Sequence, residues 1–185
     1  MSVIEAHDER SKSELRKLQA FLGVSNVPHE YHERLEGSCE WLNEREDFIE
    51  WSQTQDANDV DPTTTNNTYK PSVYWVNANP GAGKTILASH VISQLEKSRL
   101  QCAFYYFKTG TKASKLPYFL RSIAYQMAAS NSIICGELMK LYDEGTTFDI
   151  DDARAIWSKI FRASILKVCS LYIYPKPSYI HRQPF

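Results

Sequence analysis

The sequence predicts an α/β fold, in which helices cover a parallel sheet. One observation is a strand pattern over residues 72–77 that is followed at once by a glycine-rich loop and a helix pattern over 84–98. Another is a second apolar strand pattern at 101–107, after which helix patterns resume. Strands that alternate with helices along one chain are typical of a parallel sheet covered by helices.

Composition and length set the class of protein. The chain has 185 residues, 43% of them hydrophobic and 23% charged, with a formal net charge of -1. These values predict one globular domain with an appendage, and they argue against a general binder of nucleic acid or membrane surfaces. The N-terminus is too polar for a signal peptide, and no apolar run approaches the roughly 20 residues of a membrane span. We therefore expect a cytoplasmic protein.

The cysteines give no sign of a metal or disulfide framework. Cys39, Cys102, Cys135 and Cys169 are far apart and form no C-x-x-C pair. Reduced and mostly buried thiols are the expectation for such spacing.

The first predicted element is a helix over residues 11–22. Ser11 and Glu14 fit a capping box at its start, and Gly23 can end it. One face of this helix carries Leu15, Leu18 and Leu22.

A second helical region is predicted over residues 28–53. Pro28 can open it, and Gly37–Ser38 predicts a break between two helices. Its apolar side chains are Trp41, Leu42, Phe48, Ile49 and Trp51. Residues 54–71 are rich in Asp, Asn and Thr without periodicity, which predicts a linker.

The predicted core begins with the strand at 72–77 and the helix at 84–98, whose inward residues are Ile86, Leu87, Val91, Ile92 and Leu95. The strand at 101–107 is dense in aromatic residues. A helix opened by Pro117 follows, with an apolar face of Leu120, Ile123, Ala124 and Met127. Another covers about 132–142.

The last predicted helix begins at a cap, either Asp151 or Asp152. Its apolar stripe consists of Ala153, Ile156, Trp157, Ile160 and Phe161. The proline-rich stretch that follows predicts an irregular end. The predicted organisation is a helical region at 1–53, a linker at 54–71, a core domain at 72–167 and a tail at 168–185.

The strongest functional signal is the run Asn77–Thr85, which resembles the phosphate-binding pattern G-x-x-x-x-G-K-[ST]. Glycines allow backbone N–H groups to face phosphate oxygens, and the positive end of the next helix points at the same anion. Lys84 would neutralise the β- and γ-phosphates, and the Thr85 hydroxyl would bind Mg²⁺. The predicted nucleotide-binding residues are Pro80, Gly81, Ala82, Gly83, Lys84, Thr85 and Ile86, with Thr85 also the predicted metal ligand.

Ala78 stands where the pattern has its first glycine. If that residue needs a positive φ, alanine costs roughly 1 kcal/mol or slightly more, and if φ is negative the cost is small. With its strand before and its helix after, the loop predicts the three-layer α/β/α core of a P-loop NTPase, preceded by the small helical region.

An acid for hydrolysis is missing from the pattern. Such enzymes need an Asp or Glu at the end of a second core strand. The run Leu171–Tyr174 is followed by Pro175, and Asp143, Glu144, Asp149, Asp151 and Asp152 fall in predicted helix ends or turns, where capping explains them. We therefore expect no efficient turnover, and a core that is incomplete at its C-terminal side.

Three other patterns have simpler explanations. His29 and His32 are spaced i, i+3 rather than the i, i+4 of zinc proteases, so a solvated helix face is favoured. Asp56–Asp61 lacks the glycine and glutamate of a calcium loop. The aromatic run Phe104–Phe107 has no basic residues interleaved with it, so an interior strand explains it as well as base stacking does.

Four segments together resemble the N-terminal part of fungal NACHT-type STAND NTPases, the nephrocystin-3-like N-terminal domain family. They are Gly37–Leu42, Tyr74–Thr85, Ala103–Lys108 and Leu120–Gln126, and the resemblance covers about residues 12–167. It implies an ATP- or GTP-binding switch with Mg²⁺, set between an N-terminal effector and C-terminal repeats. Gly81, Gly83, Lys84 and Thr85 match the family loop, whereas Ala78 departs from it.

Family members continue beyond Lys167 into a strand that ends in acids, so we expect this chain to be truncated before that strand. The favoured function is nucleotide binding as a module of a NACHT-like signalling switch. The alternative is a non-catalytic scaffold fragment that associates with full-length NACHT-type proteins, in homotypic or heterotypic contacts. A phosphate-loop kinase is less favoured, because no acceptor site is recognisable.

Overall fold

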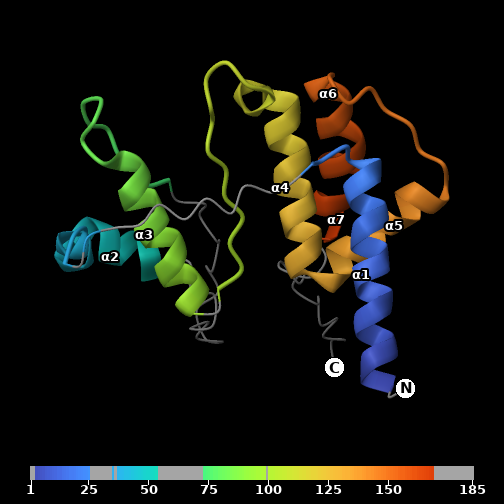
Figure 1. Ribbon diagram of the computed structural model, residues 1–185, viewed down its shortest axis with the longest axis horizontal. Helices are drawn as coiled ribbons and strands as arrows, with labels where there is room; N and C mark the ends of the chain where they lie inside the picture. The colour runs from blue at the N-terminus through green and yellow to red at the C-terminus, as the bar shows by residue number, and fades with distance from the viewer. Residues whose placement is uncertain (1–2, 26–34, 36, 54–72, 99, 169–185) are drawn as a thin grey trace, which may run out of the picture. The chain divides into compact units, whose positions relative to one another are not determined.

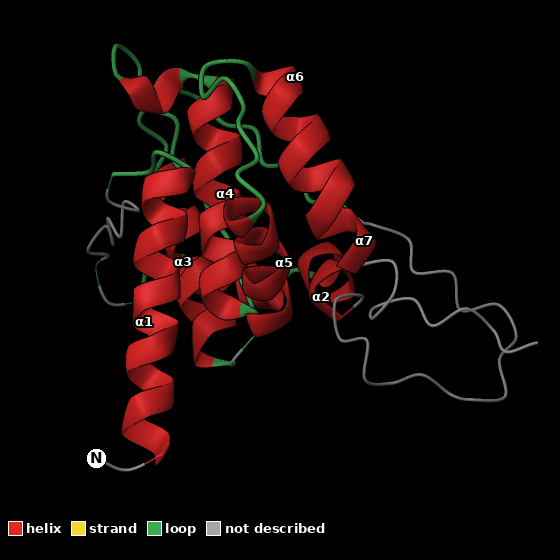
Figure 2. Ribbon diagram, turned by 90° about the vertical axis from the view of Figure 1, so that its right-hand side faces the viewer, coloured by secondary structure: helices red, strands yellow, loops and turns green. Residues whose placement is uncertain are grey.

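The computed structural model describes residues 3–25, 35, 37–53, 73–98 and 100–168. The chain divides into two units: unit 1 comprises residues 1–29 and 101–185, and unit 2 comprises residues 30–100. Within the described residues every regular element is a helix, and no strand is present (Figure 2). None of the described helices is long and apolar enough to cross a membrane.

The predicted α/β fold is therefore wrong. The described residues of the predicted strands, 73–77 and 101–107, are irregular and pair with no neighbouring strand. Their β-branched and aromatic composition is compatible with a strand, but a strand also needs a partner for its backbone N–H and C=O groups. A partner strand would have to come from a distant part of the chain, so the composition of the segment itself does not reveal whether one exists.

In unit 1 a side chain replaces the missing partner of the segment 101–107. The Phe104 N–H donates to Gln126 Oε1 at 3.0 Å, and Gln126 Nε2 donates to the Phe104 carbonyl at 2.9 Å. The primary amide of Gln126 thus satisfies both backbone groups, as a residue of a neighbouring strand would.

Unit 1 is a helical bundle built from α1 (Val3–Phe21), α4 (Leu116–Ser130) and α5 (Ser132–Asp143) with a C-terminal helix. That last helix comprises α6 (Ala153–Ile156), the π-helix η3 (Trp157–Ile165) and α7 (Leu166–Val168), and a short 3₁₀ turn, η2 (Lys112–Ser114), precedes α4. In Figure 1, α1 lies beside α4. The fully buried side chains of this core are Leu18, Leu22, Ala124, Leu138, Ile156 and Ile160.

Helix α1 confirms the end predicted for it but not the start. It begins at Val3, so Ser11 and Glu14 lie inside it and form no capping box at its N-terminus. The leucine face is correct, because Leu18 and Leu22 are buried and Leu15 packs against the same core. Gly23 ends the helix with φ +59°, while Gly23 N–H bonds Ala20 O and Val24 N–H bonds Gln19 O, each at 3.0 Å. This is the Schellman arrangement that favours glycine.

We predict that Gly23→Ala destabilises the protein more than Gly145→Ala does. Both glycines have positive φ and end a helix, so alanine strains the backbone at either site by about 1 kcal/mol. Only at Gly23 would the new Cβ also meet another group, Arg121 Nη1, at 2.8 Å. Urea denaturation of the two variants measures the difference in unfolding free energy. Equal losses would show that this close contact is harmless.

The later helices of unit 1 agree with most of the predictions. Pro117 lies in the first turn of α4, and α5 covers the predicted 132–142. Asp152 is the cap of α6, since its side chain accepts a 2.8 Å bond from Arg154 N–H. The Asn131 side chain caps α5 and was not predicted.

Trp157 departs from the predicted apolar stripe. Its side chain is 47% exposed and stacks on the Phe161 ring, with centroids 5.2 Å apart. A π-helix turns through more residues than an α-helix, so the 3.6-residue period used for the prediction does not hold over 157–165.

Unit 2 contains the 3₁₀ helix η1 (Glu40–Glu44), α2 (Glu46–Gln53) and α3 (Lys84–Lys97). Its small core consists of Leu42, Phe48 and Leu87, with Trp51, Tyr74 and Val91 packed against it. The predicted helix at 84–98 is confirmed, and Gly37, with φ +75° in a turn, confirms the break. The helix start at Pro28, the linker 54–71 and residues 169–185 of the predicted tail lie outside the described residues.

Candidate functional site

The candidate site is the loop that leads into α3. Gly81 and Gly83 have φ of +82° and +81°, a region that side-chain-bearing residues avoid. The Ala82 N–H donates to Asn79 O at 3.2 Å and tightens the turn. Gly83 is the N-cap of α3. The two glycines therefore shape the loop and start the helix.

Ala78 fits the loop without strain. Cys39 is the only residue other than glycine with a positive φ in the described part of the chain, so the φ of Ala78 is not positive. The position that departs from the phosphate-loop pattern thus costs little in backbone energy.

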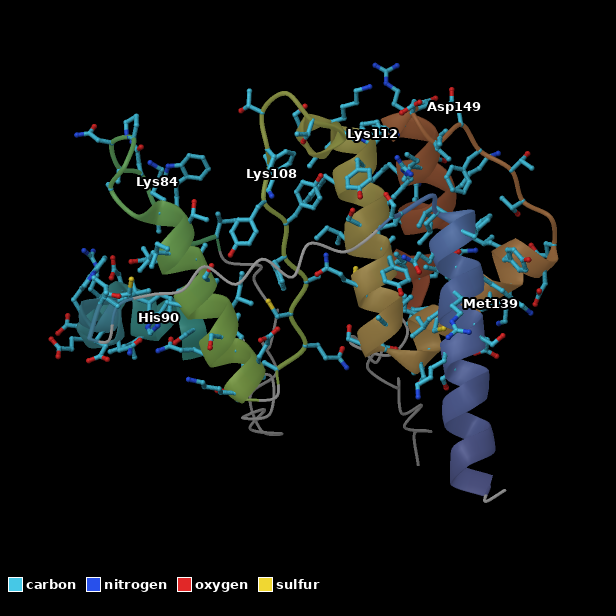
Figure 3. All side chains as sticks on the ribbon, in the orientation of Figure 1. Lys84, His90, Lys108, Lys112, Met139 and Asp149 are labelled. Atoms are coloured by element: carbon cyan, nitrogen blue, oxygen red, sulfur yellow. The ribbon has the colours of Figure 1, made fainter. Side chains whose placement is uncertain are left out.

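Lys84 joins the two ends of the loop. It is exposed at the first position of α3, as Figure 3 shows, and its Nζ donates to Ala78 O at 2.6 Å and to Asn79 O at 3.0 Å. The ammonium therefore lies over the loop, bound to neutral carbonyls rather than to a carboxylate.

The start of α3 has unused donors. Leu87 N–H makes a helical bond to Gly83 O at 2.9 Å, so the N–H groups of Lys84, Thr85 and Ile86 come before the helical ladder. No side chain caps them, and the first turn has no acid. The exposed Thr85 hydroxyl has no hydrogen bond to any described residue. Donors and a lysine thus converge at the positive end of a helix, which favours an anion.

A cavity of about 520 Å³ adjoins the loop. One part of its wall is Ala78, Gly83 and Lys84, and another is apolar, with Leu35, Trp41 and Val76. Trp41 remains 53% exposed. The volume lies within the range of small-molecule sites.

The predicted residues Pro80–Ile86 lie consecutively in the loop and the first turn of α3, and Ile86 also lines the cavity. The sequence did not predict that Leu35, Cys39 and Trp41 form part of its wall. Trp41 was assigned to apolar packing, and about forty residues separate it from the loop, so only the folded chain brings them together.

The described residues contain no preformed metal site. No three or more of their His, Cys, Asp or Glu side chains lie close enough together to hold an ion. His29, His32 and Asp56–Asp61 fall outside the described residues. In the aromatic run, Phe104, Tyr105 and Tyr106 are half-buried and Phe107 is exposed. Packing explains part of the run, because Tyr105 and Phe107 contact the Phe119 ring of α4 with centroids 5.4 Å apart.

Fold and site define a helical protein with a glycine-rich, lysine-bearing loop at the start of a helix. Residues 37–174, well over half of the chain, match the family described as Nephrocystin 3, N-terminal, and the chain belongs to this family. The match begins later and ends later than the resemblance inferred from the sequence. Comparisons with curated proteins and with solved structures found no match.

Proposed function

We propose that unit 2 is the nucleotide-binding module of a NACHT-like signalling switch, and that residues 80–86 bind the phosphates of ATP or GTP with Mg²⁺. The observation that carries this proposal is the Lys84 ammonium poised over a helix start whose N–H groups have no cap. A phosphate group would satisfy both features at once.

The residues of the loop fit such a ligand. Lys84 would exchange the carbonyls of Ala78 and Asn79 for phosphate oxygens, which form stronger, charge-assisted bonds. The N–H groups of Thr85 and Ile86 would donate to the same anion, and the Thr85 hydroxyl would bind the metal. Mg²⁺ supplies charge neutralisation to the polyphosphate and usually keeps several of its waters, so few protein ligands are needed.

The adjoining cavity supports a nucleoside rather than phosphate alone. Its apolar wall includes Trp41 and Val76, and its other wall includes Lys84 itself. An aromatic face and apolar side chains beside a phosphate site favour a planar base. We propose binding and release as the signal, without efficient hydrolysis, because none of the described residues of the loop is an acid that would position water.

The alternative is a scaffold fragment that binds full-length NACHT-type proteins. Its support is that each unit has an irregular segment with exposed apolar side chains: Val73 is 85% and Trp75 83% exposed in unit 2, and Phe107 is 60% exposed in unit 1. Unpaired segments of this composition can add to the sheet edge of a partner.

The Lys84→Ala variant tests the proposal. We expect it to weaken binding of a fluorescent ATP analogue with Mg²⁺ by about ten- to a hundredfold, because a hydrogen bond to a charged group is worth roughly 1.5–3 kcal/mol. Lys97→Ala, at the other end of α3, should leave binding unchanged. Fluorescence anisotropy measures both. Equal, negligible binding by the wild type and Lys84→Ala would contradict nucleotide binding and leave the scaffold function.

A further inference from the structure

A second cavity lies in unit 1 at the start of α4 and shares no residue with the loop of unit 2. Its volume is about 160 Å³. Three cationic side chains, Lys112, Lys115 and Arg121, line it together with Tyr118 and one acid, Asp151. We call it the α4 pocket. It is too small for a nucleotide or a drug-sized ligand, and its volume suits one tetrahedral anion.

Arg121 lines the α4 pocket and has one guanidinium nitrogen, Nη2, without a hydrogen-bond acceptor among the described residues. Its side chain is 5% exposed, and Nη1 donates to Leu22 O and Gly23 O at 2.7 Å each, while Nε donates to Pro117 O at 3.3 Å. Nη2 has no hydrogen bond to any described residue. Nη2 is not among the buried atoms that lack a partner, so it keeps access to solvent and can donate to an acceptor in the pocket that Arg121 lines. Burial lowers the pKa of Arg121, but an arginine keeps its charge.

The start of α4 adds a second source of positive potential. Lys115 is the N-cap, its side chain makes no capping bond, and the first turn contains no acid. Phe119 N–H bonds Lys115 O at 3.2 Å, so the N–H groups of Leu116 and Tyr118 precede the helical ladder. The positive end of a 15-residue helix therefore faces the same region as the lysines.

Asp151 offsets only part of this charge: its carboxylate acts to raise the pKa of Arg121, against the larger lowering by burial. Its carboxylate makes no ion pair with Lys112, Lys115 or Arg121 in the part of the chain that the structure describes. Lys112 lies in the short turn just before α4 (Figure 3). Three cations against one acid leave an excess that matches a dianion.

We propose that the α4 pocket binds a phosphate monoester or inorganic phosphate dianion, with Arg121 Nη2, Lys112 and Lys115 as donors. The guanidinium is held in place by the carbonyls of Leu22 and Gly23, so it is already oriented for an oxyanion. The shared chemistry is the tetrahedral dianion, whose source is either free phosphate or a phosphorylated side chain. This site does not depend on nucleotide binding in unit 2.

The test uses the ¹⁵N-labelled full chain with Lys84→Ala, so that binding of phosphate at the loop of unit 2 is weakened. Inorganic phosphate is titrated at constant ionic strength, and so is O-phosphoserine in a second arm. We expect saturable amide shifts at Leu116 and Tyr118. Tighter binding of phosphoserine identifies a phosphorylated side chain as the source, and equal or weaker binding identifies free phosphate.

Matched charge variants decide whether the α4 pocket is responsible. The double variant Lys112→Gln with Lys115→Gln should raise the dissociation constant about tenfold, since two exposed charge contacts are lost. Lys17→Gln with Lys97→Gln changes the net charge equally at exposed residues that do not line the pocket, and it should change the dissociation constant by less than about twofold. Absence of saturable shifts, or equal weakening in both double variants, would overturn the proposal. Arg121 is left intact in this test because it also holds the end of α1.

Discussion

Leu138→Ala is expected to lower the free energy of unfolding by about 2–5 kcal/mol, the usual cost of emptying a leucine site in a packed core. Leu138 is 0% exposed and lies on α5 within the core that α1, α4 and the C-terminal helix share. Alanine would remove three heavy atoms from that core and leave a cavity that neighbours on three elements can fill only in part. Urea denaturation followed by circular dichroism measures the loss.

Leu166→Ala is the matched control for this prediction. Leu166 carries the same side chain in the same unit, but it is 44% exposed. Because much of its surface already meets water, we expect a loss of less than about 1 kcal/mol. Similar losses for the two variants would mean that the core of unit 1 is not packed as the structure has it.

Local signals predicted the helices well. Pro117, Asp152 and Gly23 each act on the backbone within one turn, so their effect on α4, α6 and α1 follows from the sequence alone. The start of α1 was missed because Ser11 and Glu14 match a capping box that the helix does not use. A local match shows that a cap is possible and does not exclude a helix that starts earlier.

Contacts between distant segments could not be predicted in the same way. The strands expected at 72–77 and 101–107 depend on partners that composition does not reveal, and at Phe104 the partner is the side chain of Gln126. In the candidate site, the glycines and Lys84 were predicted from the pattern. The hydrogen bond from Lys84 Nζ to Ala78 O and the place of Trp41 in the cavity wall could be found only from the folded structure.

Arg121 is a buried charged residue that the sequence does not predict. It stands within the apolar pattern of α4, and at 5% exposed it is slightly more buried than its neighbour Leu120, which is 8% exposed. Its burial is stabilised because helix α1 ends beside it with two carbonyls that have left the helical ladder, those of Leu22 and Gly23. A residue of α4 thereby completes the end of α1.

We predict that Arg121→Met destabilises the protein by about 3 kcal/mol, because two carbonyls lose bonds to a charged donor that are worth roughly 1.5–3 kcal/mol each, and methionine keeps only the apolar stem. Arg162→Met is the control, since Arg162 is exposed and has no hydrogen bond to a described residue. Arg121→Lys should fall between the two, because an ammonium keeps the charge but not the geometry of the guanidinium. Thermal and urea denaturation rank the three. If Arg121→Met and Arg162→Met lose the same stability, the guanidinium does not hold the end of α1. Anion binding at the α4 pocket would then depend on Lys112 and Lys115 without an oriented guanidinium.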